Sequence, residues 1–108
     1  MATLRHEQFR TLFLDREEDL VVDERSWYGA ATEVQVPVGE IVRHAILHGS
    51  DSLLFAHNHP AGDPFPSMQD VELTRKLVKI CRELDIQVLD HIIVSCNGSF
   101  SFRRSGYM

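Results

Sequence analysis

The sequence has little of several features that define common protein classes. It contains only two cysteines among 108 residues, Cys81 and Cys96, and they form neither a metal-binding pair nor a redox motif. No apolar run approaches the roughly 20 residues needed to span a bilayer, and the N-terminus has no basic-then-apolar secretion signal. These absences predict a cytoplasmic protein in a reducing environment, without a membrane segment.

Positive charge is also scarce. Eleven lysines and arginines face sixteen aspartates and glutamates, which gives a formal net charge of −5. A protein that mainly binds nucleic acid usually shows a basic face, so this balance argues against DNA as the principal partner. Four basic residues between positions 75 and 82 share the outer face of a predicted helix. Glu72 and Glu83 lie among them, however, which favours a mixed, solvated face.

The most distinctive stretch begins with two histidines one residue apart, His57 and His59. The residues just before them, 53–56, are apolar on both faces, which predicts a buried strand. Residues two apart in an extended chain point the same way. We therefore expect both imidazoles to leave the strand end on one side, with Asn58 on the other.

A loop and a helix are predicted next. Prolines at 60, 64 and 66 exclude regular structure, and Ser67 occupies the N-cap position of a helix from Met68 to Leu84 or Asp85. On a helical wheel Asp70 lies on the inward stripe, which it shares with Leu73, Leu77, Cys81 and Leu84. A carboxylate on an apolar stripe must be paired, protonated or bound to a cation.

Two imidazoles and one carboxylate make a three-ligand set. Catalytic zinc commonly takes three protein ligands and leaves a fourth position for water, so the stretch predicts a Zn²⁺ site formed by His57, His59 and Asp70. Ser67 and Asp70 also fit a capping box, which needs no metal. The two roles are compatible, and the sequence leaves both open.

The run HNHPAGDPFPSMQD at 57–70, followed by LDHIIVS at 89–95, resembles the JAMM (MPN-type) metalloprotease motif, and more closely the RadC family's version of it. EQFRTLFLD at 7–15 and VPVGEIVRHAIL at 36–47 match more loosely, so the resemblance covers nearly the whole chain. Ala61 stands where the family pattern has a serine, and Val38-Gly39 stand where an arginine is expected. Neither position is a presumed ligand.

The resemblance implies a zinc-dependent hydrolase of amide or isopeptide bonds, with a peptide or isopeptide as substrate. In JAMM enzymes an upstream glutamate is the general base and the motif serine helps to bind the oxyanion. By position these residues are Glu7 and Ser67. The RadC family also carries a DNA-repair label, so a DNA-repair association or a non-catalytic binding module is the alternative. A zinc nucleobase deaminase is excluded, because H-x-E and P-C-x-x-C are both absent.

The chain is expected to form a single α/β domain over residues 1–108, without the helical segment that longer RadC-like proteins carry before it. Strands are predicted at 7–15, 20–22, 32–37, 53–56, 86–95 and 99–102, with helices at 38–48 and 68–84. This order gives a mixed β-sheet of about six strands with two main helices. The resemblance implies a JAMM/MPN domain similar to the cytidine deaminase-like fold.

Three histidines besides the pair carry weaker signals. His44 and His48 lie four apart on the first helix but lack the H-E-x-x-H pattern, so both are expected at the surface. That helix is expected to turn Ile41, Val42, Ala45 and Ile46 inward. In the strand 86–95, Asp90 and His91 point to opposite faces, so at most one can face the site and orient a metal ligand.

Overall fold

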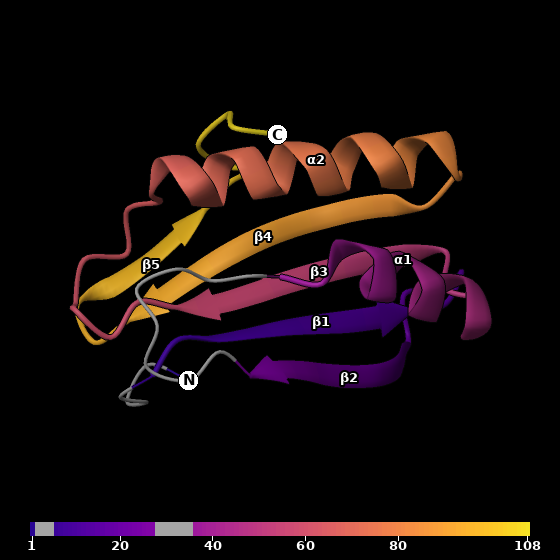
Figure 1. Ribbon diagram of the computed structural model, residues 1–108, viewed down its shortest axis with the longest axis horizontal. Coiled ribbons are helices and arrows are strands. Elements are labelled where there is room, and N and C mark those ends of the chain that lie inside the picture. The colour runs from indigo at the N-terminus through magenta and orange to yellow at the C-terminus, as the bar shows by residue number, and fades with distance from the viewer. Residues whose placement is uncertain (2–5, 28–35) are drawn as a thin grey trace.

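A five-stranded mixed sheet with two helices makes up the described part of the chain (Figure 1), for which a computed structural model places residues 1, 6–27 and 36–108. The elements are β1 (Gln8–Leu14), β2 (Leu20–Trp27), α1 (Val38–Leu47), β3 (Ser52–Asn58), α2 (Met68–Glu83), β4 (Gln87–Ser95) and β5 (Gly98–Ser101). The strand order is β2-β1-β3-β4-β5. β3 and β4 are parallel and connected through α2, whereas the other neighbouring strands are antiparallel. The expected mixed α/β architecture is confirmed.

Both helices cover the same face of the sheet. Glu24 of β2 and His91 of β4 lie in one row of cross-strand partners, so their side chains share a face. His44 of α1 pairs with Glu24, and Thr74 of α2 contacts His91. The core lies between this face and the helices and includes Phe9, Phe13, Ile41, Ala45, Leu53, Phe55, Leu77, Cys81, Ile86 and Val88.

β2 is longer than the sequence predicts. A loop was expected from Asp23 onward, but the strand continues to Trp27 in antiparallel register with β1. The prediction was wrong because the four consecutive polar residues at 23–26 resemble a loop. In the folded chain two of them have partners: Asp23 forms an ion pair with Arg10 of β1, and Glu24 bonds to His44 of α1. An edge strand can accept such residues because one of its sides faces solvent.

The remaining elements agree with the sequence to within a few residues. The strand predicted at 32–37 lies mostly outside the described residues, and residues 36 and 37 belong to no strand. Gly49 ends α1 with a φ of +63°, as expected of a helix stop. Two residues expected inward are exposed instead: Ile46 is 60% exposed and Leu84, which follows the last turn of α2, is 44% exposed. The buried residues of α1 are Ile41 and Ala45. Among the described residues, no helix has the length and apolarity to cross a membrane.

Candidate metal centre

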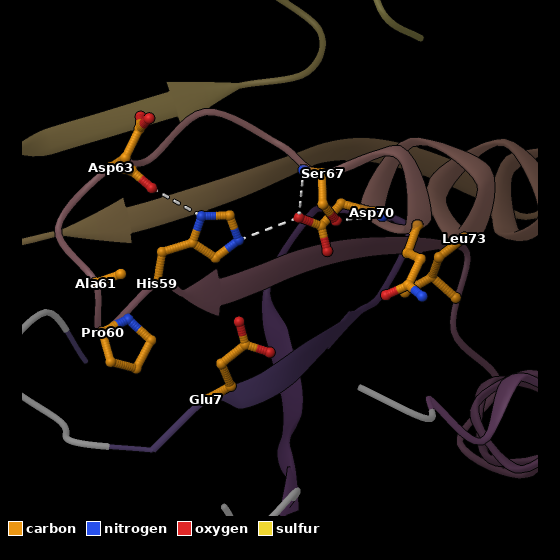
Figure 2. A pocket seen from close by; sticks show the side chains of 9 residues that line it. Glu7, His59, Pro60, Ala61, Asp63, Ser67, Asp70 and Leu73 are labelled. Atoms are coloured by element: carbon orange, nitrogen blue, oxygen red, sulfur yellow. Dashed lines mark hydrogen bonds and ion pairs between the residues drawn. The ribbon is translucent and has the colours of Figure 1, made fainter. Parts of the chain in front are cut away.

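Three segments meet at one end of the sheet: the residue before β1, the end of β3 and the first turn of α2. The antiparallel register sets Phe9 of β1 opposite His57 of β3, which brings Glu7 to the end of β3. Figure 2 shows the side chains of Glu7, His59 and Asp70 directed into a common pocket. The pocket has a volume of about 270 Å³ and is lined by Glu7, His59, Pro60, Ala61, Asp63, Ser67, Gln69, Asp70 and Leu73.

His57 lies behind this pocket with its imidazole almost fully enclosed. Its side chain is 1% exposed, and within the described part of the chain neither ring nitrogen has a hydrogen-bond partner. Nε2 lies 3.8 Å from Oε2 of Glu7, and Nδ1 lies 3.8 Å from Oδ1 of Asp70. A buried polar group without a partner costs about 1–3 kcal/mol. A cation bound to one of these nitrogens would remove part of that cost.

His59 and Asp70 form a hydrogen-bonded pair at the pocket wall. His59 Nδ1 donates to the backbone oxygen of Asp63 at 2.9 Å, and Nε2 lies 3.1 Å from Oδ2 of Asp70. The hydrogen bond to Asp70 raises the pKa of His59, against the opposing effect of burial. Burial alone would raise the pKa of Asp70, but the bond to His59, the electrostatic interaction with His57 and the donors of Ser67 together lower it to about 2.

The predicted capping box is present in both directions. The backbone N–H of Asp70 donates to Oγ of Ser67 at 3.0 Å, and the backbone N–H of Ser67 donates to Oδ2 of Asp70 at 2.9 Å. These bonds use one carboxylate oxygen of Asp70. The other oxygen, Oδ1, is the one that faces His57. The cap therefore leaves Asp70 with an oxygen for a ligand, and the capping and metal roles are geometrically compatible.

The set of three metal-type donors that the structure brings together among the described residues differs from the set that the sequence predicts. Ligand atoms of Glu7, His57 and His59 all lie within 4.8 Å of one another. The sequence-predicted set replaces Glu7 with Asp70, which contacts both histidines. Both sets share the two imidazoles, and both suit zinc, which accepts nitrogen and carboxylate oxygen ligands. In the first set Glu7 is a metal ligand, whereas in the second it is free to act as a general base.

His91 of β4 is linked to the first turn of α2 through Thr74. It is completely buried, and its Nδ1 lies 2.6 Å from Oγ1 of Thr74. Thr74 donates its single hydroxyl proton to the backbone oxygen of Asp70 at 2.8 Å, so the Nδ1 of His91 is the donor in the other bond. Burial lowers the pKa of His91 to about 3, which keeps the ring neutral. The chain of bonds ties β4 to the first turn of α2.

Asp90 points to the opposite face, as the strand alternation predicts. Its carboxylate accepts from the hydroxyl of Ser101 at 2.5 Å and from the backbone of Arg103 at 3.0 Å. Thr74 was missed from the sequence, although a threonine on the inward side of α2 was the available signal. Asn58 was also missed as a functional candidate; its polar side chain at the end of a buried strand was the corresponding signal.

Residues 1–107 match the sequence profile of the RadC-like JAB domain. Three similar proteins are a UPF0758 protein of Ruegeria pomeroyi, a UPF0758 protein of Coxiella burnetii and the UPF0758 protein YkfG of Escherichia coli. They are 36%, 40% and 36% identical over 100%, 99% and 100% of this chain. The aligned parts cover 48%, 49% and 68% of those proteins.

The chain thus spans about half the length of the first two relatives. The family match extends over nearly the whole sequence, and it agrees with a mixed sheet that gathers Glu7, His57, His59 and Asp70 at one end. This chain belongs to the RadC-like JAB domain family.

Proposed function

We propose that the chain is a zinc-dependent hydrolase of amide or isopeptide bonds, in which His57, His59 and Asp70 hold the metal. The observation that carries this proposal is the burial of His57, whose ring nitrogens have no hydrogen-bond partner among the described residues and lie 3.8 Å from carboxylates of Glu7 and Asp70. An enclosed donor set of this kind is chemically suited to a cation. A bound zinc supplies a Lewis acid and a water whose pKa falls toward about 7.

Two side chains of the pocket have the chemistry for proton transfer and charge stabilisation. The Glu7 carboxylate is 27% exposed and directed into the pocket, where it can accept a proton from water and deliver it to the leaving amine (Figure 2). Ser67 Oγ accepts the N–H of Asp70, and the hydroxyl proton makes no hydrogen bond within the described residues. That proton is available for the oxyanion that develops during hydrolysis.

The first test is the metal content of the purified protein. We expect about one zinc per chain in the wild type, and loss of zinc in His57→Ala and Asp70→Ala. Because alanine at position 70 also removes the reciprocal half of the capping box, Asp70→Asn is the matched variant: it keeps an oxygen for the N–H of Ser67 but loses the charge. A wild-type protein that stays free of zinc after zinc is added back would contradict the proposal.

Glu7→Gln decides between the two donor sets. If Glu7 is the general base, this variant retains zinc and its rate of hydrolysis falls roughly 10²- to 10⁴-fold. If Glu7 is a ligand, the variant loses zinc as His57→Ala does. Hydrolysis is screened on zinc-loaded protein with peptides and isopeptide-linked peptides, since the family and the pocket do not specify a sequence.

A second candidate function is a non-catalytic binding module, with DNA association as one form of it. It is favoured by the capping box and the His59–Asp70 pair, which satisfy Oδ2 of Asp70 without a metal. The net charge of −5 does not favour DNA. A DNA affinity that falls steeply with salt, together with a zinc-free wild-type protein, would support this alternative.

A further inference from the structure

We infer that Asn58 is a positioning residue that fixes Glu7 relative to the histidines; this inference rests on the proposed function, in which Glu7 is the general base. Asn58 is buried at the end of β3. Its Oδ1 accepts the backbone N–H of Gln8 at 2.5 Å, and its Nδ2 donates to the backbone oxygen of His6 at 2.9 Å. These two groups belong to the peptide units on either side of Glu7.

The side chain of Asn58 continues the pairing of β1 with β3 beyond the backbone ladder. The backbone register between these strands starts at Phe9 opposite His57, so the next residues, Gln8 and Asn58, lie past its end. A side-chain amide carries the same donor and acceptor as a peptide group. The orientation of this amide is determined, because a flipped amide would set its NH₂ against the N–H of Gln8 and its oxygen against the carbonyl of His6.

The carboxylate of Glu7 has no comparable restraint of its own. Within the described residues it accepts no hydrogen bond, and its ion-pair contact is with Nε2 of His57 at 3.8 Å. Its place in the pocket therefore follows from the backbone that carries it, which Asn58 holds on both sides. Asn58 also stands between His57 and His59, so one strand end carries both imidazoles and the group that fixes the base.

The test uses Co²⁺ in place of zinc, because the visible absorption of Co²⁺ reports its surroundings without a substrate. The midpoint of the pH-dependent absorption change is measured in wild type, Glu7→Gln, Asn58→Ala and the double variant. Loss of the nearby carboxylate charge in Glu7→Gln should lower the midpoint by about one pH unit. Asn58→Ala should shift it in the same direction, and should cause no further shift when Glu7 is already replaced.

Hydrogen exchange of the Gln8 amide is the metal-free readout. We expect it to be roughly tenfold faster in Asn58→Ala, because its acceptor is lost. Asn58→Leu preserves side-chain volume and replaces the alanine variant if that variant does not fold. Gln87→Ala is the matched control, since it removes an exposed amide at the start of β4 and should change neither the midpoint nor the exchange.

The two possible failures can be distinguished. Additive midpoint shifts in the double variant, or unchanged exchange at Gln8, would overturn the positioning role of Asn58 and leave the proposed function standing. Absence of Co²⁺ and zinc binding in the wild type would overturn the proposed function, and this inference with it.

Discussion

Replacement of His91 by phenylalanine should make the metal-free protein less sensitive to acid. His91 is completely buried, stacks on Phe102 at a ring-centroid distance of 4.5 Å, and has an Nε2 without a hydrogen-bond partner in the described part of the chain. Phenylalanine keeps a ring in that stack and removes the group that can take up a proton. Thr74 keeps its bond to the backbone of Asp70, so the hydroxyl stays satisfied.

The magnitude follows from the pKa of His91, which burial lowers from 6.5 to about 3. Because the unfolded chain binds the proton first, this residue's contribution to stability is complete above pH 6.5 and is lost as the pH falls toward 3. At 1.36 kcal/mol per pH unit, the loss between pH 7 and pH 5 is about 2 kcal/mol. Since small domains are stable by about 5–15 kcal/mol, such a loss is readily measured.

The assay is urea unfolding at pH 7 and pH 5 in the presence of a chelator, for wild type and His91→Phe. The free energy of unfolding of the wild type should fall by about 2 kcal/mol more than that of the variant. Comparison with the variant cancels the contributions of groups that both proteins share. Equal losses in the two proteins would refute the reasoning, since His91 would then have the same proton affinity folded and unfolded.

Three further predictions concern the core, the cap and the thiols. Leu77→Ala should lower the free energy of unfolding by about 2–5 kcal/mol, because the side chain is fully buried, whereas Leu84→Ala at a half-exposed position should cost under about 1 kcal/mol in the same urea titration. Ser67→Ala should cost about 1 kcal/mol in chelator, through loss of the N-cap, and a smaller effect would contradict the capping box. A thiol reagent at pH 8 should label the exposed Cys96 in the native protein and Cys81 only after unfolding, because burial raises the pKa of Cys81 to about 11; two labelled thiols in the native protein would contradict this.

The parts of the fold that the sequence predicts well are those with local signals. The start of α2 follows from Ser67 after a proline-rich loop, and the inward position of Asp70 follows from helical periodicity. The end of β2 could not be predicted, because Asp23 and Glu24 depend on partners 13 and 20 residues away along the chain. Periodicity describes a segment by itself, whereas an edge strand is defined by its neighbours.

The candidate site likewise has a part with local sequence signals and a part that depends on distant residues. The segment from His57 to Asp70 carries its spacing in the sequence, and the structure brings both histidines into contact with Asp70. That contact supports the predicted ligand set without testing it. The partners of Asn58 lie 50 and 52 residues away, so its bonds to the backbone around Glu7 had no local signal. The resemblance suggested Glu7 by position, and the register of β1 with β3 explains why it reaches the pocket.

Under the proposed function, the arrangement of the strands makes metal retention and proton transfer separable by mutation. His57, His59 and Asp70 lie on one continuous stretch of chain, from the end of β3 to the first turn of α2, and a short connection of this kind closes at low entropic cost. Glu7 arrives from a distant part of the sequence through the pairing of β1 with β3. Under the proposed function, in which Glu7 is the base and not a ligand, damage to the start of β1 would leave a protein that still captures a metal ion but no longer transfers the proton.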